Sequence, residues 1–289
     1  MHASEGPRHA QPDNLDPATV DGFGVEWQRF DHSGRPSAEL DAIFADYFSL
    51  FRWELLPDGA EGFDVGCGSG RWAARVAPNP KVGKLHCIDA SPSALEVARR
   101  NVASFSNCEL HLASVDALPL ADGSQDFGYS LGVLHHVPDT RAGLAACVRK
   151  LKPGAPFLVY LYYSLDNRAA YYRAVWRASD AARRSIAALP ERARTVVSDV
   201  IAATVYWPLA RTARLVERLG FDPAGIPLAW YRDRTFYVMR NDALDRFGTQ
   251  LEQRFSRAEI LQMLEGAGLE RIAFREGPPY WCAIGYKPA

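Results

Sequence analysis

The sequence predicts an α/β protein with a doubly wound, mixed sheet, and three observations support this prediction. Short apolar runs alternate with helical patterns between residues 61 and 162, which is typical of parallel strands joined by crossover helices. A glycine-rich turn, GCGSG, directly follows the first of these runs. Two more apolar runs near the C-terminus are separated by the turn REGPP. Because this turn is too short for a crossover helix, we expect an antiparallel hairpin there.

Composition and charge narrow the class of protein. The 289 residues are 48% hydrophobic and carry a formal net charge of -1, so no basic domain suggests a nucleic-acid partner. No apolar run approaches the ~18 residues of a membrane span, and the N-terminus shows no apolar signal segment. The five cysteines form no CxxC pair, which indicates reduced thiols and no metal site. We expect a cytoplasmic protein with a small-molecule partner and no integral membrane association, and we leave its oligomeric state open.

The N-terminal region divides into two predicted parts. Residues 1–20 are rich in Pro, Asp, Asn and His without periodicity, which indicates a disordered tail. Residues 21–60 should form a helical cap. Apolar residues recur there at helical spacing, on a stripe of Leu40, Ile43, Phe44, Tyr47 and Phe48.

The predicted core spans residues 61–163 and is completed by residues 256–289. Its strands are the runs EGFDV, KLHCID, CELHLA, DFGYSL and PFLVYLY, with helices near 70–78, 91–104 and 140–151. Each crossover should be right-handed. In the C-terminal part, Ser256 with Glu259 three residues later predicts a capped helix that ends at Gly266 or Gly268. The hairpin strands LERIAF and YWCAIGY follow it.

A mainly helical insertion is predicted over residues 164–255. Its first helix should bury the face formed by Tyr172, Val175, Trp176, Ala182, Ile186 and Leu189, opposite Arg168, Arg173, Arg177 and Arg184. Its second helix should bend at Trp207, because Pro208 removes a backbone donor, and should end near Gly220. Since the insertion follows the carboxyl end of a strand, where ligands bind in open α/β sheets, we interpret it as a substrate lid.

Three strand ends carry residues suited to one ligand. The glycine-rich turn offers free backbone N–H groups at a helix start, which favours an anionic group. The dinucleotide pattern GxGxxG is not met, because Arg71 stands at the third glycine position. Asp89 follows the second strand, where an acid can hold a ribose. Asp116 follows the third strand beside Ala117 and can accept from an exocyclic amine. The set indicates a ligand with a carboxylate, a ribose and an adenine.

The order of five motifs resembles the class I S-adenosylmethionine-dependent methyltransferases, in their small-molecule branch. The motifs are FDVGCGSG, IDAS, VDALPL, QDFGYSLGVLHHV and LKPGAPFLV, and the resemblance covers most of residues 60–163 and the closing hairpin. It implies a Rossmann-like, seven-stranded sheet with the last strand antiparallel. It also implies S-adenosylmethionine as cofactor and S-adenosylhomocysteine as product.

The resemblance assigns cofactor contacts residue by residue. It places Gly66, Cys67, Gly68 and Gly70 at the methionine part, Asp64 near its amine, Asp89 and Ala90 at the ribose, Asp116 and Ala117 at the adenine, and Leu131 near the sulfonium. Structural alternatives stay open. Asp64 or Asp89 can cap a helix, Asp116 can begin a turn, and Cys67 can be a small filler.

Two adjacent histidines are the candidate catalytic bases. His136 matches a histidine common in the small-molecule branch, and His135 stands where many relatives have glutamate. Histidine titrates near neutrality and can take a hydroxyl or ammonium proton. The alternative is that both are structural, one packed and the other hydrogen-bonded to backbone.

The insertion carries the residues expected to select the acceptor. Residues 164–255 contain 15 Arg and no Lys against 10 Asp plus Glu, a net of 15 − 10 = +5, which favours an anionic acceptor. Arginine also outnumbers lysine elsewhere, so composition alone is an alternative. We expect substrate contacts from Tyr231, Arg232, Tyr237 and Arg246.

Three other functions stay open: a nicotinamide-dependent oxidoreductase, a noncatalytic binder, and methylation of a lipid-linked acceptor at a membrane surface through the amphipathic stretch VYWPLARTARLVERL.

Overall fold

A central sheet organises the computed structural model, which describes residues 14–31 and 37–289. Its seven strands lie in the order β3-β2-β1-β4-β5-β7-β6. They are β1 (Ala60–Val65), β2 (Val82–Asp89), β3 (Cys108–Leu112), β4 (Phe127–Leu131), β5 (Pro156–Tyr160), β6 (Glu270–Phe274) and β7 (Cys282–Tyr286). The first five are parallel, and β7 runs antiparallel to both β5 and β6. The predicted doubly wound sheet and its closing hairpin are confirmed.

Local capping explains where the core helices begin. α4 (Pro92–Asn101) starts after Ser91, whose side chain accepts from the Ala94 N–H, and α5 (Thr140–Lys150) starts after Asp139 in the same way. In α10 (Arg257–Gly266), Ser256 and Glu259 form the predicted capping box. Short helical segments complete the core: α3 (Ala73–Val76), η1 (Trp53–Leu55), η2 (Val115–Ala117) and η3 (Leu134–His136).

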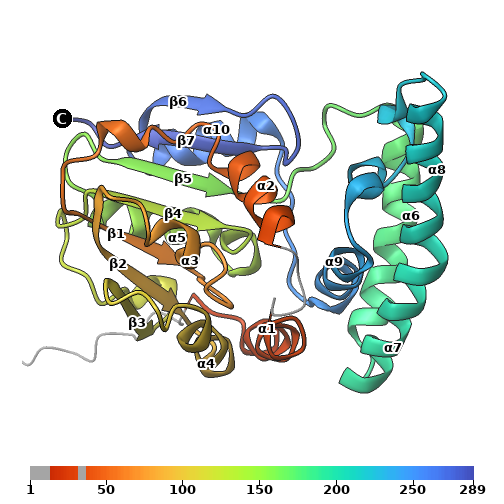
Figure 1. The fold of residues 1–289 in the computed structure, drawn as a ribbon, viewed down its shortest axis with the longest axis horizontal. Helices are drawn as coiled ribbons and strands as arrows, with labels where there is room; N and C mark the ends of the chain where they lie inside the picture. The colour runs from red at the N-terminus through yellow and green to blue at the C-terminus, as the bar shows by residue number, and fades with distance from the viewer. Residues whose placement is uncertain (1–13, 32–36) are drawn as a thin grey trace, which may run out of the picture.

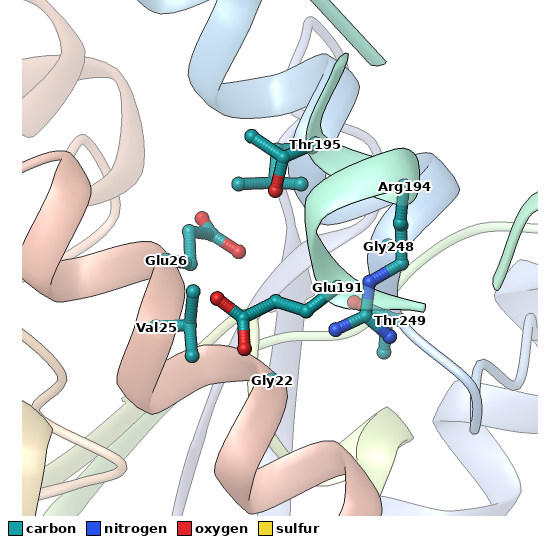
Figure 2. Close-up of a pocket in the computed structure, with 9 residues that line it drawn as sticks. Gly22, Val25, Glu26, Glu191, Arg194, Thr195, Gly248 and Thr249 are labelled. Carbon is teal, nitrogen blue, oxygen red and sulfur yellow. The ribbon is translucent and has the colours of Figure 1, made fainter. Parts of the chain in front are cut away.

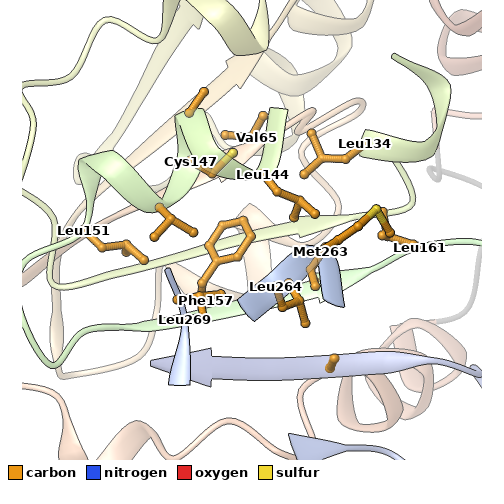
Figure 3. Close-up of a cluster of buried hydrophobic side chains, with 14 of the residues drawn as sticks. Val65, Leu134, Leu144, Cys147, Leu151, Phe157, Leu161, Met263, Leu264 and Leu269 are labelled. Atoms are coloured by element: carbon orange, nitrogen blue, oxygen red, sulfur yellow. The ribbon is translucent and has the colours of Figure 1, made fainter. Parts of the chain in front are cut away.

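Helices cover both faces of the sheet. On one face, Leu144 and Cys147 of α5 and Met263 and Leu264 of α10 pack around Phe157 of β5 (Figure 3). The other face is covered by α2 (Ser37–Tyr47), α3 and α4, with a core of aromatic and aliphatic side chains. The parallel strands are therefore buried on both sides, as expected for a doubly wound fold.

Two glycines make room for phenyl rings at the centre of the sheet. β1 and β4 pair with Gly62 opposite Phe127 and Phe63 opposite Gly128. A Cβ added at Gly62 would lie 2.3 Å from the Phe127 ring, and one added at Gly128 would lie 2.3 Å from the Phe63 ring. Each ring thus occupies the space that a side chain on the neighbouring strand would need.

Gly128→Ala is expected to destabilise the protein by about 1–3 kcal/mol, the usual cost of overpacking a core. The Phe63 ring is fully buried and cannot move aside freely. Urea unfolding measures the effect, and adding Phe63→Leu should restore part of the loss. Gly266→Ala is the matched control, because its added Cβ would meet nothing within 4 Å. Equal stability of Gly128→Ala and Gly266→Ala would contradict the prediction.

The N-terminal cap begins earlier than predicted. Residues 1–13, most of the predicted tail, lie outside the described residues, but α1 (Pro17–Arg29) already includes residues 17–20. Asp16 caps this helix by accepting from the Thr19 N–H, and Pro17 suits its first turn. The second cap helix, α2 (Ser37–Tyr47), buries Leu40 and Ile43 of the predicted stripe.

The insertion is helical and stands at the carboxyl edge of the sheet. Figure 1 shows α7 (Glu191–Ile201) and α8 (Trp207–Arg218) end to end at one end of the molecule, with α6 (Ala170–Ala187) beside them and α9 (Phe236–Gly248) between them and the sheet. The segment Ala202–Tyr206 (η4) is π-helical directly before Trp207 and Pro208, and α8 ends at Arg218, close to the predicted end at Gly220. The predicted bend at Trp207 stays a prediction. Short 3-10 segments, η5 (Pro223–Gly225) and η6 (Ala229–Asp233), lead into α9.

The predicted buried face of α6 is partly wrong. Val175 is 56% exposed and Leu189 is 38% exposed, whereas Asp180, Arg183 and Ala187 are buried. The Arg183 guanidinium donates to Asp180 at 2.8 Å and to the Thr249 carbonyl at 2.9 Å. Because this ion pair satisfies the buried charges, the polar residues can face inward and the helix rotates away from the apolar pattern.

Candidate active site

One large cavity lies between the carboxyl edge of the sheet and the helical insertion. Its volume is about 690 Å³, within the range of small-molecule sites. Ten predicted site residues line it: Gly66, Cys67, Gly68, Asp89, Ala90, Leu131, His136, Tyr231, Arg232 and Arg246. Six do not: Asp64, Gly70, Asp116, Ala117, His135 and Tyr237. The sheet edge and the insertion therefore contribute to a single site.

The three glycines of the turn have different neighbours. All have positive φ, a conformation that favours glycine. A Cβ at Gly66 would lie 2.4 Å from Val133, and one at Gly68 would lie 2.9 Å from the Trp27 ring. A Cβ at Gly70 would lie 3.2 Å from Ala98 in α4. Gly70 thus packs the turn onto α4, while Gly66 and Gly68 form part of the cavity wall.

The carboxylate of Asp89 ties the glycine turn to the start of α4. One oxygen accepts from the Gly68 N–H at 2.8 Å and the other accepts from the Ser91 N–H at 2.8 Å. Burial raises the pKa of Asp89, and these backbone N–H groups act in the opposite direction. Asp89 therefore has a structural role as well as a position on the cavity wall.

Asp64 and Asp116 lie away from the cavity wall. Asp64 is buried, which raises its pKa, and its Oδ2 has no hydrogen-bond partner among the described residues. Asp116 and Ala117 are exposed, while Ala113, Ser114 and Val115 line this end of the cavity instead. Their predicted cofactor contacts stay predictions.

The two histidines differ in how their ring nitrogens are used. His136 Nδ1 donates to the Leu251 carbonyl at 2.7 Å, so Nε2 carries the lone pair of the neutral ring. Nε2 is buried without a hydrogen-bond partner among the described residues, and burial lowers the pKa of His136 to about 4. His135 lies behind the wall, where its Nδ1 accepts from the Tyr162 N–H at 3.4 Å. Only His136 combines a free lone pair with a place on the wall.

Three of the carboxyl groups that line the cavity accept hydrogen bonds from neighbouring side chains: Glu26, Asp242 and Asp245. Glu26 Oε1 accepts from Asn241 at 2.5 Å, Asp242 accepts from the Tyr231 hydroxyl at 2.9 Å, and Asp245 accepts from the Tyr162 hydroxyl. Burial, together with the charge of Asp245, raises the pKa of Glu26. Sequence reasoning missed Glu26 and Tyr162. The signal for Glu26 was available, because it shares a helical face with Phe23, Trp27 and Phe30.

In the Asp245→Asn variant, the free energy of unfolding should lose the part of its pH dependence that the Asp245 carboxyl group contributes. Burial raises the pKa of Asp245 to about 6, against about 3.9 in an unfolded chain. Between these values the folded state holds a proton that the unfolded state has lost, so this group lowers the free energy of unfolding as pH rises. The variant should gain stability relative to the parent across this window, by about 3 kcal/mol.

Urea unfolding of parent and variant between about pH 4 and pH 6.5 measures this difference, and the comparison cancels contributions from groups that Asp245 does not perturb. The contribution of Glu26, whose pKa the Asp245 charge raises, changes in the same direction. Tyr162→Phe is the matched control, because it keeps the carboxyl group and removes its hydrogen-bond donor. That variant should retain the pH-dependent component. A stability difference between parent and Asp245→Asn that is constant with pH would contradict the prediction.

The arginines around the cavity are largely compensated. Arg232 donates to Glu217 at 2.8 Å, and Arg254 donates to Glu252 at 2.7 Å. Arg246 lies 3.6 Å from Glu252 and donates to Ser179. Arg71, on the cavity wall, lies between the rings of Trp27 and Trp72, with its guanidinium carbon 4.9 and 4.6 Å from their centroids. Arg168 of the insertion also lines the cavity and has no ion pair among the described residues. The positive charge of the insertion is therefore not fully compensated at the cavity.

Two features lie outside the main cavity. Tyr237 packs edge-on against Phe30, with centroids 5.2 Å apart, so its predicted substrate contact is not supported by its position. Figure 2 shows a second, small cavity between α1, α7 and the end of α9, lined by Glu26, Glu191 and Thr195 among others. At about 10 Å³ it has room for no more than about one water. It is not a ligand site.

Comparisons with known proteins agree with the geometry. The methyltransferase domain family matches residues 63–159. The chain is similar to the ubiquinone biosynthesis O-methyltransferase of Xanthomonas axonopodis pv. citri, with 32% identity over 183 residues, covering 61% of this chain and 72% of the relative. It is also 37% identical over 100 residues to an uncharacterized 37.1 kDa protein of a Streptomyces fradiae transposon, covering 33% of this chain and 28% of that protein.

Two solved structures share the fold. One is a chain from the complex between the Haloferax volcanii Trm112 methyltransferase activator and a methyltransferase, with a TM-score of 0.51 and 16% identity over 92% of this chain and 98% of that one. The other is the S-adenosylmethionine-dependent methyltransferase SibL, with a TM-score of 0.52 and 14% identity over 88% of this chain and 57% of that one. At these identities the likeness establishes the fold.

Proposed function

The chain belongs to the class I S-adenosylmethionine-dependent methyltransferases, and from this premise we propose that it methylates a small-molecule acceptor held beneath its helical insertion. The supporting observation is the single cavity of about 690 Å³, whose wall combines the glycine turn and Asp89 with residues of the insertion. Family membership makes the enzyme a methyltransferase that uses S-adenosylmethionine and sets aside the nicotinamide-dependent alternative.

The residues at the sheet edge fit the cofactor. Glycines at positions 66 and 68 bring the backbone to the cavity wall, and Asp89 offers a carboxylate at the end of β2. We assign the ribose to Asp89 and the methionine part to the turn. When bound, S-adenosylmethionine supplies a methyl group on a positively charged sulfur.

The acceptor proposed here is neutral, hydroxyl-bearing and ring-containing. Aromatic rings wall the acceptor side of the cavity: Tyr160, Tyr162, Trp176, Tyr206, Trp230 and Tyr231. The carboxyl groups of Glu26, Asp242 and Asp245 are suited to accept hydrogen bonds from hydroxyl groups. Arg232, Arg246 and Arg254 each lie beside a carboxylate, which weighs against a strongly anionic acceptor at these three residues. The O-methyltransferase relative supports oxygen as the acceptor atom.

His136 is the proposed general base. Its Nδ1–H is held by the Leu251 carbonyl, so Nε2 stays available to take the proton that a hydroxyl acceptor loses. The residues that line the cavity contribute mainly by orienting the acceptor and by fixing the direction of the Nε2 lone pair. Positioning of this kind can account for about 7–11 kcal/mol of a barrier.

Calorimetry with S-adenosylmethionine, S-adenosylhomocysteine and NAD tests the cofactor site. Binding of the first two without NAD supports the proposal, and binding of NAD alone overturns it. Transfer of labelled methyl from S-adenosylmethionine into a metabolite extract tests turnover. Cofactor binding without any labelled product would identify a noncatalytic binder.

The five cysteines are all free in the structure, which supports the expected cytoplasmic location.

A lipid-linked acceptor is a second candidate, favoured by the surface of α8 and the turn after it. Trp207, Leu215, Leu219 and Phe221 are exposed there, and Arg211, Arg214 and Arg218 lie on the same segment. Apolar and cationic side chains together suit an anionic membrane surface. No helix among residues 14–31 and 37–289 is long and apolar enough to cross a membrane. Flotation with phosphatidylcholine vesicles, with and without phosphatidylglycerol, decides this point. Equal recovery of the protein with and without phosphatidylglycerol would contradict the lipid-linked acceptor.

A further inference from the structure

A second group of chemically capable side chains lies on the sheet, outside the cavity. His86 of β2 stands opposite Glu109 of β3, and His111 follows two residues after Glu109 on the same face of that strand. β3 is the edge strand of the sheet (Figure 1). None of these residues lines the cavity. The proposed methyl transfer leaves this group without a role.

The ligand atoms of the three residues converge on one point. His86 Nδ1 and His111 Nε2 are 2.9 Å apart, and Glu109 oxygens lie 3.7 Å from His86 Nδ1 and 3.8 Å from His111 Nε2. All three ligand atoms lie within 4.8 Å of one another. Two imidazole nitrogens that bind one zinc ion at 2.0–2.1 Å are about 2.9–3.4 Å apart. The two histidines are therefore already close to coordinating positions.

A fourth residue orients the buried histidine. His86 Nε2 lies 2.6 Å from the Glu61 carboxylate. Because a carboxylate accepts, Nε2 carries the proton, and the lone pair of the neutral ring is on Nδ1, which faces His111. A carboxylate behind a ligating histidine is the usual arrangement that fixes the ring and its tautomer in metal sites. His86 is only 5% exposed, so its ring is also held by packing.

We propose that His86, His111 and Glu109 form a binding site for a borderline divalent transition metal such as Zn²⁺. Two imidazoles and one carboxylate select such ions over Mg²⁺ or Ca²⁺, which prefer oxygen ligands. Three protein ligands leave a position for solvent. The site joins β2 to the edge strand β3 on the segment that ends in Asp89. Sequence reasoning expected no metal site, because the ligands come from different strands and show no motif spacing.

The charges around the site allow this ligand set. Lys84 lies 3.0 Å from Glu109 and competes with a metal for its carboxylate. The Glu109 side chain is 49% exposed, so it can turn toward the histidines. Its oxygens need to move by less than about 1 Å to reach ordinary metal-binding positions. Lys84 is therefore a useful probe, because it is a neighbour of the site without being a ligand.

The experiment uses the full chain, without an affinity tag, after treatment with a chelator. Calorimetry with Zn²⁺ should show one tight site, and Mg²⁺ should not compete. His111→Ala should weaken Zn²⁺ binding at least 100-fold, and Glu61→Gln should weaken it about 10- to 100-fold, as for other residues behind metal ligands. Lys84→Ala, the matched control, should bind Zn²⁺ as tightly as the parent or more tightly.

Two results would overturn the proposal. One is Zn²⁺ binding that persists unchanged in His111→Ala, which would locate it elsewhere, for example at His2 and His9 of the N-terminal segment. The other is Zn²⁺ binding no tighter than Mg²⁺ binding in the parent. Glu109→Gln changes an exposed side chain, so it supplies a second variant that should fold normally. Affinity for S-adenosylmethionine, measured on the same metal-free samples, separates failure of this site from failure of the proposed function.

Discussion

Asp89→Ala is expected to weaken S-adenosylmethionine binding by about 10²- to 10⁴-fold. A carboxylate that accepts from both ribose hydroxyls contributes two charge-assisted hydrogen bonds, each about 1.5–3 kcal/mol, and every 1.4 kcal/mol is about tenfold in affinity. The substitution also removes the acceptor that holds the Gly68 N–H at 2.8 Å. Both losses act in the same direction, because the turn must keep its shape to receive the cofactor.

Calorimetry with S-adenosylmethionine and S-adenosylhomocysteine measures this loss, and Ser91→Ala is the matched control. Ser91 caps α4 through the Ala94 N–H at 3.3 Å, so its loss should cost about 1 kcal/mol of stability. It leaves the Asp89 carboxylate in place and should leave cofactor affinity within a few-fold of the parent. An Asp89→Ala protein that binds the cofactor as the parent does would remove the basis of the cofactor assignment.

The sequence was sufficient to predict the core because its signals are local. Alternation of apolar runs and capped helices located all seven strands, and the short REGPP turn required the hairpin that β6 and β7 form. Ser256 and Glu259 form the expected capping box. These features depend on residues within a few positions of one another.

The errors and omissions have a common physical cause, which is contact between segments far apart in the chain. The apolar pattern placed Val175 and Leu189 on a buried face, but both are exposed, and Arg183 is buried with Asp180 and the Thr249 carbonyl as partners. Gly70 was assigned to the cofactor, whereas α4 occupies the space beside it. Glu26 is 215 residues from Asn241, its hydrogen-bond partner. Sequence spacing carries no signal for such pairs.

The glycine turn and Asp89 could be placed at the cavity from sheet topology, whereas the residues of the insertion could not. Gly66, Gly68 and Asp89 follow from the ends of neighbouring parallel strands, which must meet at one edge of the sheet. Tyr231 and Tyr237 come from the same short segment, yet only Tyr231 lines the cavity. That outcome depends on how α9 packs against α1, where Tyr237 meets Phe30.

His136→Ala is expected to lower kcat by about 10²- to 10⁴-fold, the range for loss of a general base, with cofactor affinity close to that of the parent. The His136 Nε2 atom carries a buried lone pair at the cavity wall, while Nδ1 only fixes the ring by donating to the Leu251 carbonyl. The assay follows labelled methyl transfer to the acceptor found in the extract. Because burial lowers the pKa of His136 to about 4, Nε2 stays unprotonated at neutral pH, and it is a weaker base than an ordinary imidazole.

His136→Asn separates the catalytic role from a structural one. An asparagine amide can reproduce the Nδ1–H donor to Leu251 but offers nothing at the position of Nε2, so this variant should fold like the parent and still lose kcat. His136→Gln would offer an oxygen or nitrogen near Nε2 without the basicity of imidazole, and it should be equally slow. If His136→Asn keeps the parent kcat, proton removal is not its role. The buried histidine would then serve, as the sequence alternative held, to pack the segment after β4 against residue 251.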